Sequence, residues 1–386
     1  MSDTMLDENI VNDPLIKGVV RNSIELWNSN DVTDEKSVDI ANSYTKYVAR
    51  KWIFIIICVI AVFVAVGISL TIGDYPLEFF ETYEIMWDHI TGNVQDGLKD
   101  HIVFNLRLPR ILIGIVAGVG LAVAGVVMQS TLMNPLADSY TTGVSSGASL
   151  GATLAVVMGF SIGGATSQYG IIANAFVFSL IPMAVIILLS KVKNSSPTVM
   201  IMGGIAIMYI FGAFTTLFTL MANPNDLEYL YKWGVGSLGF ASKNDLPVMA
   251  LFVVVGSIAL MLLTKQLNAL AAGDDSAKSL GVDADMMRRI CLLITALVVA
   301  AVVSFTGTIG FVGLVAPHVI RMVVGPDNRY LLPASALFGG VLLLCADVVG
   351  RTILSPSILQ AGVVMAFMGG PLFLWLIIRK NSVVWG

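Results

Sequence analysis

Residues 107–152 read RLPRILIGIVAGVGLAVAGVVMQSTLMNPLADSYTTGVSSGASLGA. The stretch contains, in order, an Arg-Pro-Arg corner, a glycine-rich apolar run, an Asn-Pro turn and a second run of small residues. Asn134-Pro135 removes a backbone donor and disfavours helical geometry just before it, and Asp138 places a charge where the chain should leave lipid. The order predicts two membrane-spanning helices joined by a turn at an aqueous edge.

Small residues recur at a fixed interval in both runs. Gly143, Gly147 and Gly151 are four residues apart in the second run, as Gly114 and Gly118 are in the first. Residues at this interval share one face of a helix and leave a bare ridge that a neighbouring backbone can approach. We therefore predict close helix packing at Gly143, Gly147 and Gly151.

The composition indicates an integral membrane protein. Of 386 residues, 56% are hydrophobic and 12% are charged, and the mean hydropathy is +0.84, whereas soluble domains have about 25% charged residues. Runs long enough to cross roughly 30 Å of hydrocarbon lie near 52–72, 110–130, 169–190, 197–221, 245–264, 331–352 and 357–378. Shorter or glycine-interrupted runs lie near 142–160, 288–305 and 308–324. We predict an all-α, polytopic fold with about ten transmembrane helices in residues 46–386, after a polar cytoplasmic tail of residues 1–45.

Lysine and arginine positions predict the orientation. Ten spans place both termini on one side, and thirteen Lys or Arg residues then lie on that side against six on the other. These six are Lys99, Arg107, Arg110, Lys232, Lys243 and Arg351. Because cytoplasmic loops carry the excess of positive charge, we predict a multi-pass plasma-membrane protein with both termini in the cytoplasm.

A spacing of glycine and proline recurs half a chain apart. The two sets are Gly125, Pro135 and Gly143, then Gly307, Pro317 and Gly325. The matching spans cross in opposite directions, which indicates an inverted internal repeat, a feature of transporters. Chance is the alternative, because the chain is rich in glycine.

A long polar interruption separates the sixth and seventh spans and reads LNALAAGDDSAKSLGVDADMMRR. Asp274 and Asp275 follow Gly273, where negative charge suits a helix N-terminus, so we predict a short helix over 275–280. Other loops are short, and a loop of ~20 residues is usually functional. It is either a docking surface for a soluble partner or an ordinary loop helix.

Several motifs in order resemble the permease family of ATP-driven importers for cobalamin, ferric siderophores and haem. They are RLPR, NPLAD followed by GVSSGASLG, GDDSAKSLGV, GFVGLVAPHVIR, ADVVGR and GGPLFLWLIIRK, and the resemblance covers roughly residues 50–380. It implies a dimer, usually of identical permeases, with the conduit at the dimer interface. It also implies two cytosolic ATPase subunits that use ATP and Mg, an external substrate-binding protein, and no role for nucleic acid. The permease itself would hold no cofactor or metal and would not be an enzyme.

The resemblance assigns roles to particular residues. Arg107 and Arg351 match positions that dock the binding protein, and Asn134, Pro135 and Leu136 match the cytoplasmic gate. The ATPase-coupling segment corresponds to Gly273, Asp274, Asp275, Ala277, Lys278, Leu280 and Gly281. Ser139 departs from the family, which usually has proline there.

The alternative from another class is an ion- or proton-coupled secondary transporter. Such proteins carry ionisable residues at mid-membrane, and here Asp347 is the main candidate, although it lies four residues from Arg351 and can pair with it on one helix. The chain has no GxxxxGK[ST] phosphate-binding loop, so an ATP-driven mechanism needs a separate ATPase. The sequence leaves the choice among ferric siderophore, haem and cobalamin open.

Overall fold

The computed structural model describes residues 34–73, 75–162, 168–192 and 196–379, and every regular element in these ranges is helical. The chain divides into two units, residues 1–53 and 54–386. In the first unit the described residues begin helix α3 (Asp34–Thr71), which continues into the second unit. Of the predicted polar tail, residues 1–33 lie outside the described residues, so its cytoplasmic position stays a prediction.

Ten apolar helical segments correspond to the ten predicted spans. Six are long and apolar enough to cross a membrane: Thr45–Thr71, Gly97–Thr131, Gln168–Lys191, Pro197–Thr219, Ala284–Thr306 and Asn328–Thr352. A seventh combines α11 (Leu246–Leu262) and α12 (Thr264–Ala271), which bend by 65° at their junction. Three shorter apolar helices complete the set: α7 (Val144–Met158), α15 (Val312–Val324) and the part Ala361–Leu372 of α17 (Ala361–Arg379). The run near 288–305, predicted to be short, is a full-length span over Ala284–Thr306. The predicted fold class is confirmed.

The labels and bounds of the long helices and of the connecting helices are as follows. The spans are α6 (Leu108–Thr131), α8 (Gln168–Val192), α9 (Pro197–Thr219), α14 (Ala284–Thr306) and α16 (Asn328–Thr352). The connecting elements are α4 (Phe79–Thr91), α5 (Gly97–His101), the π-helical turn η1 (Ile102–Arg107), α10 (Pro224–Val235) and α13 (Asp274–Ser279). α13 begins one residue earlier than the predicted helix over 275–280, because Gly273 already adopts its capping conformation with φ 101°.

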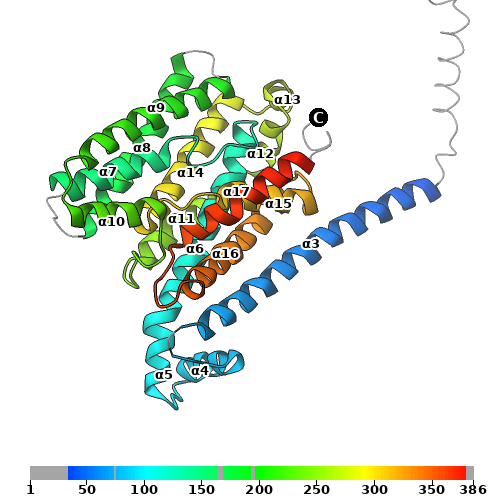
Figure 1. Ribbon diagram of the computed structural model, residues 1–386. Coiled ribbons are helices and arrows are strands. Elements are labelled where there is room, and N and C mark those ends of the chain that lie inside the picture. The colour runs from blue at the N-terminus through cyan, green and yellow to red at the C-terminus, as the bar shows by residue number, and fades with distance from the viewer. Residues whose placement is uncertain (1–33, 74, 163–167, 193–195, 380–386) are drawn as a thin grey trace, which may run out of the picture. The chain divides into compact units, whose positions relative to one another are not determined.

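Helix α6 is the centre of the second unit (Figure 1). Of the 18 most apolar consecutive residues in this span, 78% are buried. α6 packs on α11, α14, α15 and α16. α7, α8 and α9 form a neighbouring group, in which α7 packs on both α8 and α9. Two apolar clusters hold these groups together, one around Val253 and Val302 and one around Met128 and Val299.

Glycines allow α6 to approach its neighbours backbone to backbone. A Cβ added at Gly118 would overlap the carbonyl group of Gly339 on α16. A Cβ at Gly125 would overlap the carbonyl group of Gly313 on α15. Contacts this close maximise dispersion attraction between helices in lipid, where no hydrophobic force drives association.

The small residues of α7 face α8 in the same way. A Cβ added at Gly147 or Gly151 would overlap the carbonyl oxygen of Phe178 or Asn174 on α8. Gly143 precedes α7 with φ 79°, a conformation that glycine adopts without strain, and it lies beside α9. The interval of four residues thus lies along the line where α7 meets its neighbours.

The two halves of the chain have a similar order of elements, whereas the three matched positions do not correspond. The spans form two sets of five, and the second span of each set, α6 or α14, has 78% or 72% of its most apolar 18 residues buried. Each is followed by a non-helical connection and a short helix, α7 or α15. Gly125, however, lies inside α6, whereas Gly307 follows the end of α14. The spacing therefore does not give the register of the repeat.

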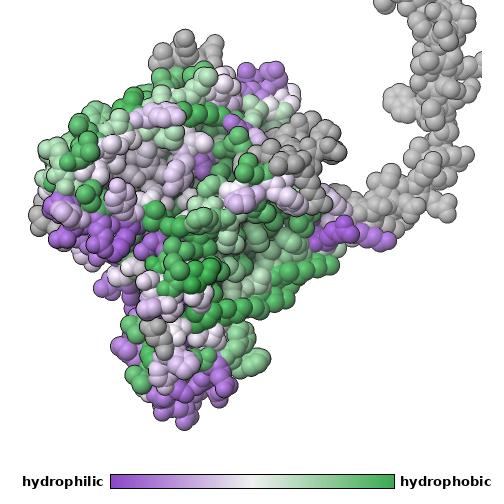
Figure 2. Space-filling model, viewed as in Figure 1, coloured by the Kyte–Doolittle hydropathy of each residue, from purple (hydrophilic) through white to green (hydrophobic). Residues whose placement is uncertain are grey.

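The second unit has two polar ends, named here by the helices that they carry. Residues 69–110 with Asp347–Arg351 form the α4 end, and residues 264–288 with the end of α6 form the α13 end (Figure 1). Figure 2 shows apolar residues over the long helices and hydrophilic residues gathered where α4 and α5 lie. The predicted docking and coupling residues belong to these two ends, and the predicted gate residues follow the end of α6.

Candidate functional sites at the two ends of the bundle

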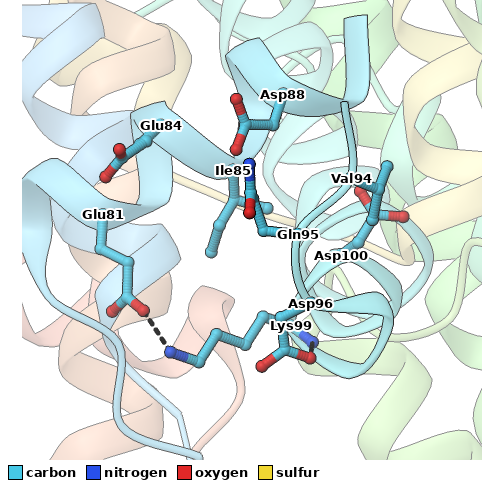
Figure 3. A pocket seen from close by; sticks show the side chains of 9 residues that line it. All are labelled: Glu81, Glu84, Ile85, Asp88, Val94, Gln95, Asp96, Lys99 and Asp100. Carbon is cyan, nitrogen blue, oxygen red and sulfur yellow. Dashed lines mark hydrogen bonds and ion pairs between the residues drawn. The ribbon is translucent and has the colours of Figure 1, made fainter. Parts of the chain in front are cut away.

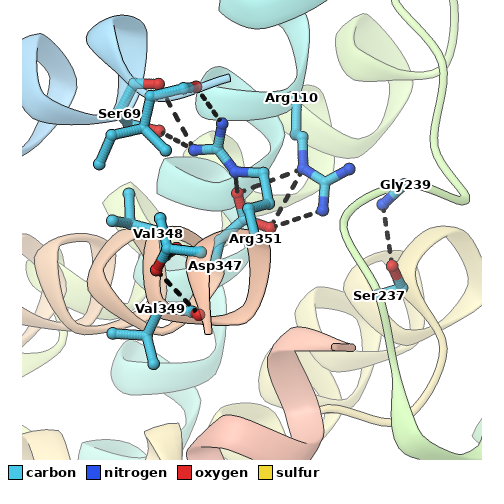
Figure 4. Close-up of polar contacts among 10 residues, drawn as sticks. Ser69, Arg110, Ser237, Gly239, Asp347, Val348, Val349 and Arg351 are labelled. Carbon is cyan, nitrogen blue, oxygen red and sulfur yellow. Dashed lines mark hydrogen bonds and ion pairs between the residues drawn. The ribbon is translucent and has the colours of Figure 1, made fainter. Parts of the chain in front are cut away.

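A buried carboxylate joins two arginines at the α4 end (Figure 4). Asp347 on α16 accepts from Nη2 of Arg110 on α6 at 2.8 Å, and Nε of Arg351 lies 2.9 Å from its other oxygen. The side chain of Asp347 is only 2% exposed. A carboxylate buried this deeply is stable when paired and hydrogen-bonded, so Asp347 fastens α6 to α16.

Arg107 and Arg351, the predicted docking residues, also hold the end of α3. Arg351 donates to the carbonyl oxygen of Ile72 at 2.8 Å and to the hydroxyl of Ser69 at 2.7 Å. Arg107 donates to the carbonyl oxygens of Leu70 and Tyr75. The last carbonyls of a helix have no partner within it, and α3 has no basic residue in its own last turn. Arginines from η1 and α16 supply the missing donors.

These arginines line a pocket of about 310 Å³ at the α4 end. Its wall includes Arg107, Arg110 and Arg351 beside Gly73 and Tyr75. Arg107 is 8% exposed, so most of its side chain serves the packing against α3 and a smaller part faces the pocket. Among the described residues of this cluster three guanidinium groups accompany one carboxylate, which favours an anionic group in the pocket.

A second pocket at this end is acidic (Figure 3). It lies between α4 and α5 and is lined by Glu81, Glu84, Ile85, Asp88, Val94, Gln95, Asp96, Lys99 and Asp100. Lys99 pairs with Glu81 at 2.5 Å, and this hydrogen bond lowers the pKa of Glu81. In the part of the chain that the structure describes, no group of three His, Cys, Asp or Glu side chains is placed to hold a metal ion.

The predicted gate residues lie in the connection over 132–143 that follows α6. Oδ1 of Asn134 accepts from the backbone N–H of Leu136 at 2.8 Å and closes a tight turn. Pro135 occupies the middle of this turn, where it needs no donor. The side chain of Leu136 is 47% exposed. The turn therefore presents an apolar side chain at its tip.

Asp138 differs from the sequence-based expectation. Its side chain does not mark an aqueous edge, because Asp138 is 5% exposed. Oδ1 accepts from the backbone N–H groups of Tyr140 and Thr141 at 3.0 and 2.9 Å, so the carboxylate caps the next turn of the chain. This side-chain-to-backbone pattern is typical of Asp, but the hydropathy pattern alone does not reveal it.

Tyr140 links the two non-helical connections of the repeat, a contact that the sequence did not reveal. Its hydroxyl donates to the carbonyl oxygen of Thr308 at 3.2 Å, and its ring lies against Gly310. Residues 307–311 join α14 to α15 as residues 132–143 join α6 to α7. Non-helical backbone within a membrane bundle persists only where protein or a water-filled cavity surrounds it, and such breaks are typical of transport sites.

The predicted coupling segment is a small, exposed helix on an apolar base. Ala277 is fully buried against Ala269, Leu270 and Ala284. The exposed positions of the segment are Asp275, Ser276, Lys278, Ser279, Leu280 and Gly281. Leu280 is 70% exposed, which is unusual for a leucine beside this much polar surface. The segment thus presents a mixed polar and apolar surface at the α13 end.

Arg288 anchors this segment, although the sequence placed it only among the charges that orient the chain. It lies near the start of α14, is fully buried, and pairs with Asp274 of α13 at 2.5 Å. It also donates to the carbonyl oxygen of Thr131, the last residue of α6, at 2.9 Å. A basic residue in the first turns of an apolar helix was the signal in the sequence, but the contact with Thr131 spans 157 positions and no local pattern indicates it.

An integral membrane protein with ten apolar helices, breaks inside the bundle and polar clusters at both ends belongs to the class of transport proteins. Residues 57–379 match the model of the FecCD transport family, and the chain belongs to this family. The predicted family is confirmed. The chain is accordingly a permease subunit and not itself an enzyme.

Relatives and a solved structure agree with this assignment. The hemin transport system permease protein HmuU of Yersinia pestis is 37% identical over 324 residues, which cover 84% of this chain and 94% of that protein. The cobalamin import system permease protein BtuC of Halobacterium salinarum is 38% identical over 278 residues, or 72% of this chain and 73% of that protein. An inward-facing metal-chelate type ABC transporter has a TM-score of 0.74 at 29% identity, covering 84% of this chain and 99% of that one. Membership implies ATPase and binding-protein partners.

Proposed function

We propose that this permease imports an iron chelate, either a ferric siderophore or haem, or cobalamin, across the plasma membrane. The observation that carries the proposal is the match to HmuU and BtuC, whose names specify hemin and cobalamin. The likeness to a metal-chelate type transporter supports the same class of bulky cargo. Hydrolysis of ATP by a separate subunit supplies the energy, because this chain has no phosphate-binding loop.

Both termini lie in the cytoplasm, and the α13 end faces the ATPase. The excess of Lys and Arg on the side of the termini supports this orientation. Arg107, Arg110, Arg351 and Lys243 gather at the α4 end, where Lys243 donates to Asn105 at 3.4 Å. In this orientation the acidic pocket and the arginine-lined pocket both face outward.

A second copy of the chain completes the conduit. Of the 18 most apolar consecutive residues of α9, only 6% are buried within one chain. The corresponding share is 33% in both α3 and α8. Met202, Tyr209 and Phe214 are exposed along α9, and Met368 is exposed on α17. One face of α9 contacts lipid, and the other faces its counterpart in a homodimer. Exposed methionines provide a compliant, weakly binding wall.

The cytosolic ATPase binds the exposed coupling segment around α13, and the external binding protein docks at the arginine-lined pocket. Leu280 and Lys278 offer the ATPase one apolar and one charged contact. Acidic groups on the binding protein complement the three arginines of the pocket. Asn134, Pro135 and Leu136 form the cytoplasmic gate, which opens when α13 moves.

The surroundings of Asp347 support ATP-driven import better than they support transport coupled to an ion gradient. The candidate acid, Asp347, is held between Arg110 and Arg351. Its carboxylate is 2% exposed and is already used to join α6 to α16, which is a structural role.

Transport in proteoliposomes tests the proposal. The permease is reconstituted with its ATPase and binding protein, and labelled cobalamin, ferric siderophore and haem are offered with and without internal ATP. The control is the same complex with the phosphate-binding lysine of the ATPase replaced. We expect ATP-dependent accumulation of one cargo. Uptake that follows an imposed proton or sodium gradient and ignores ATP would overturn the proposal.

A further inference from the structure

One buried guanidinium group joins three helices at the α13 end. Arg288 has no exposed side-chain surface. Its Nη2 pairs with Oδ1 of Asp274 at 2.5 Å, and its Nε donates to the carbonyl oxygen of Thr131 at 2.9 Å. A third, longer contact of 3.4 Å reaches Asp285 on its own helix, α14. The first contact joins α14 to the preceding helix α13, and the second joins α14 to the end of α6, 157 positions earlier in the sequence.

Asp274 and Thr131 lie in different elements. Asp274 is the first residue of α13, the helix at the centre of the coupling segment. Thr131 is the last residue of α6, and the gate connection over 132–143 follows it directly. The carbonyl of Thr131 lies in the last turn, where carbonyls lack helical partners. Arg288 therefore supplies a partner to the end of the helix that leads into the gate.

The chemistry of this link is directional. The planar guanidinium group holds its donors in a fixed fork, so the carboxylate of Asp274 and the carbonyl of Thr131 are fixed relative to one another. α13 is also attached to the bundle by the apolar packing of Ala277 against Ala269, Leu270 and Ala284. Apolar packing of small side chains has no preferred direction and tolerates sliding, whereas separating a buried ion pair leaves uncompensated charge.

We propose that Arg288 is the positioning residue that transmits movement of α13 to the C-terminal end of α6 and so to the gate. The inference rests on the proposed function, because it assumes that an ATPase moves α13. When α13 shifts, the ion pair with Asp274 carries Arg288 along, and the hydrogen bond to Thr131 moves the start of the gate connection. The start of α14, the end of α6 and α13 then move together at the α13 end.

Replacement by lysine keeps the positive charge but removes the fixed arrangement of guanidinium donors. Arg288→Lys keeps a cation beside Asp274 but cannot hold Asp274 and Thr131 together, because the ammonium is a point charge. The readouts are cargo imported and ATP hydrolysed by the complete complex in proteoliposomes, expressed as cargo per ATP. We expect cargo per ATP to fall by about tenfold, while basal hydrolysis stays within about twofold of the wild type. If Arg288 only stabilised the fold, the amount of cargo imported and the amount of ATP hydrolysed would fall in proportion, and cargo per ATP would not change.

The matched control is Asp285→Asn. Asp285 is the third partner of Arg288 but lies on the same helix, so its contact joins no separate elements. We expect this variant to retain cargo per ATP within about twofold of the wild type. Asp274→Asn provides a second test if Arg288→Lys fails to assemble, because it weakens the link from the partly exposed side of the pair. It should lower cargo per ATP in the same way.

The outcomes separate this inference from the function on which it rests. Wild-type cargo per ATP in Arg288→Lys, or in Asp274→Asn where the first variant does not assemble, would overturn the transmission role. Equal loss in Asp285→Asn and Arg288→Lys would also overturn it, because any disturbance of the charge cluster would then suffice. A wild-type complex that imports no cargo on ATP would instead reject the proposed function.

Discussion

Arg110 and Asp347 join α6 to α16 across 237 positions of sequence, with both Nε and Nη2 of the arginine directed at one carboxylate. Arg351 reaches the same carboxylate from the next turn of α16. Three charged side chains thus form one nearly buried unit at the α4 end (Figure 4). Neither arginine can lose Asp347 without leaving positive charge in a poorly solvated place.

Asp347→Ala should lower the free energy of unfolding by about 3–5 kcal/mol, because it leaves Arg110 and Arg351 without their shared counterion. Thermal unfolding of the purified permease in detergent measures the effect. Glu228→Gln is the control, since the pair of Glu228 with Lys232 lies on the exposed surface of α10 and should contribute nothing measurable. Equal melting temperatures for Asp347→Ala and the wild type would contradict a structural role for the pair.

Gly125→Ala should destabilise the protein by about 1–3 kcal/mol, because the added Cβ overlaps the carbonyl group of Gly313 and separates α6 from α15. Gly234→Ala on α10 is the matched control, since no atom lies within 4 Å of its added Cβ. Alanine favours helix there, so this variant should gain up to about 1 kcal/mol. Unfolding in detergent distinguishes the two, and a stable Gly125→Ala would show that α6 and α15 can separate without cost.

Hydropathy predicted which segments form apolar helices, and glycine spacing predicted where helices pack closely. Neither pattern predicted which faces of two helices meet. The ten spans follow from apolar runs, and α13 follows from Gly273 and the acidic residues after it. The pairing of Asp347 with Arg351 also follows from their separation of four residues. The partner Arg110 does not, because it depends on which faces of α6 and α16 meet.

Local hydrogen bonding explains the remaining differences. Asp138 turns inward because two backbone N–H groups satisfy its carboxylate, and no periodicity in the sequence records that. Arg288 is buried because Asp274 and Thr131 surround it, although its position beside Arg289 suggested a charge facing the cytoplasm. Buried polar residues are placed by tertiary partners, which a single sequence does not list.

Docking by Arg107 and Arg351 must be separated from their contacts with α3. Charge reversal at either position would also break hydrogen bonds to the carbonyls of Leu70 or Ile72. Arg110→Gln offers a cleaner variant of the pocket, because Arg351 remains beside Asp347. We expect Arg110→Gln to lower stimulation of the ATPase by the loaded binding protein about tenfold, with basal hydrolysis unchanged.

The salt dependence of that stimulation provides the control for Arg110→Gln. If the pocket receives acidic groups, stimulation in the wild type should weaken as ionic strength rises, and the variant should respond less. Stimulation that is insensitive to both salt and substitution would exclude electrostatic docking at this pocket.

The carboxylate of Asp327 should make the free energy of unfolding depend on pH in the acid range. Burial raises its pKa, but hydrogen bonds from Arg329 and Asn268 outweigh burial and lower the pKa to about 2. A carboxylate with a pKa lower in the folded than in the unfolded state stabilises the fold above the unfolded value, and that contribution disappears as pH falls toward about 2. Asp327→Asn should therefore cost about 1 kcal/mol at pH 7, after allowance for solvent screening, and progressively less below about pH 4. A constant difference in melting temperature from pH 7 to pH 3 would contradict this assignment.

Leu280 tests whether the coupling segment binds the ATPase through its apolar tip. The side chain is 70% exposed while Ala277, three residues earlier, is buried in the base of the segment. Leu280→Glu should leave the fold intact, because the substituted side chain faces solvent, but it places a charge in the proposed interface, where an unpaired buried charge is unfavourable. We expect the ATPase to be lost from complexes purified through the permease and uptake to fall with it. Lys278→Gln is the milder comparison, since a charge at an interface rim contributes less than an apolar anchor. Retention of the ATPase by Leu280→Glu would place the contact elsewhere on the α13 end, and the exposed leucine would then need another partner.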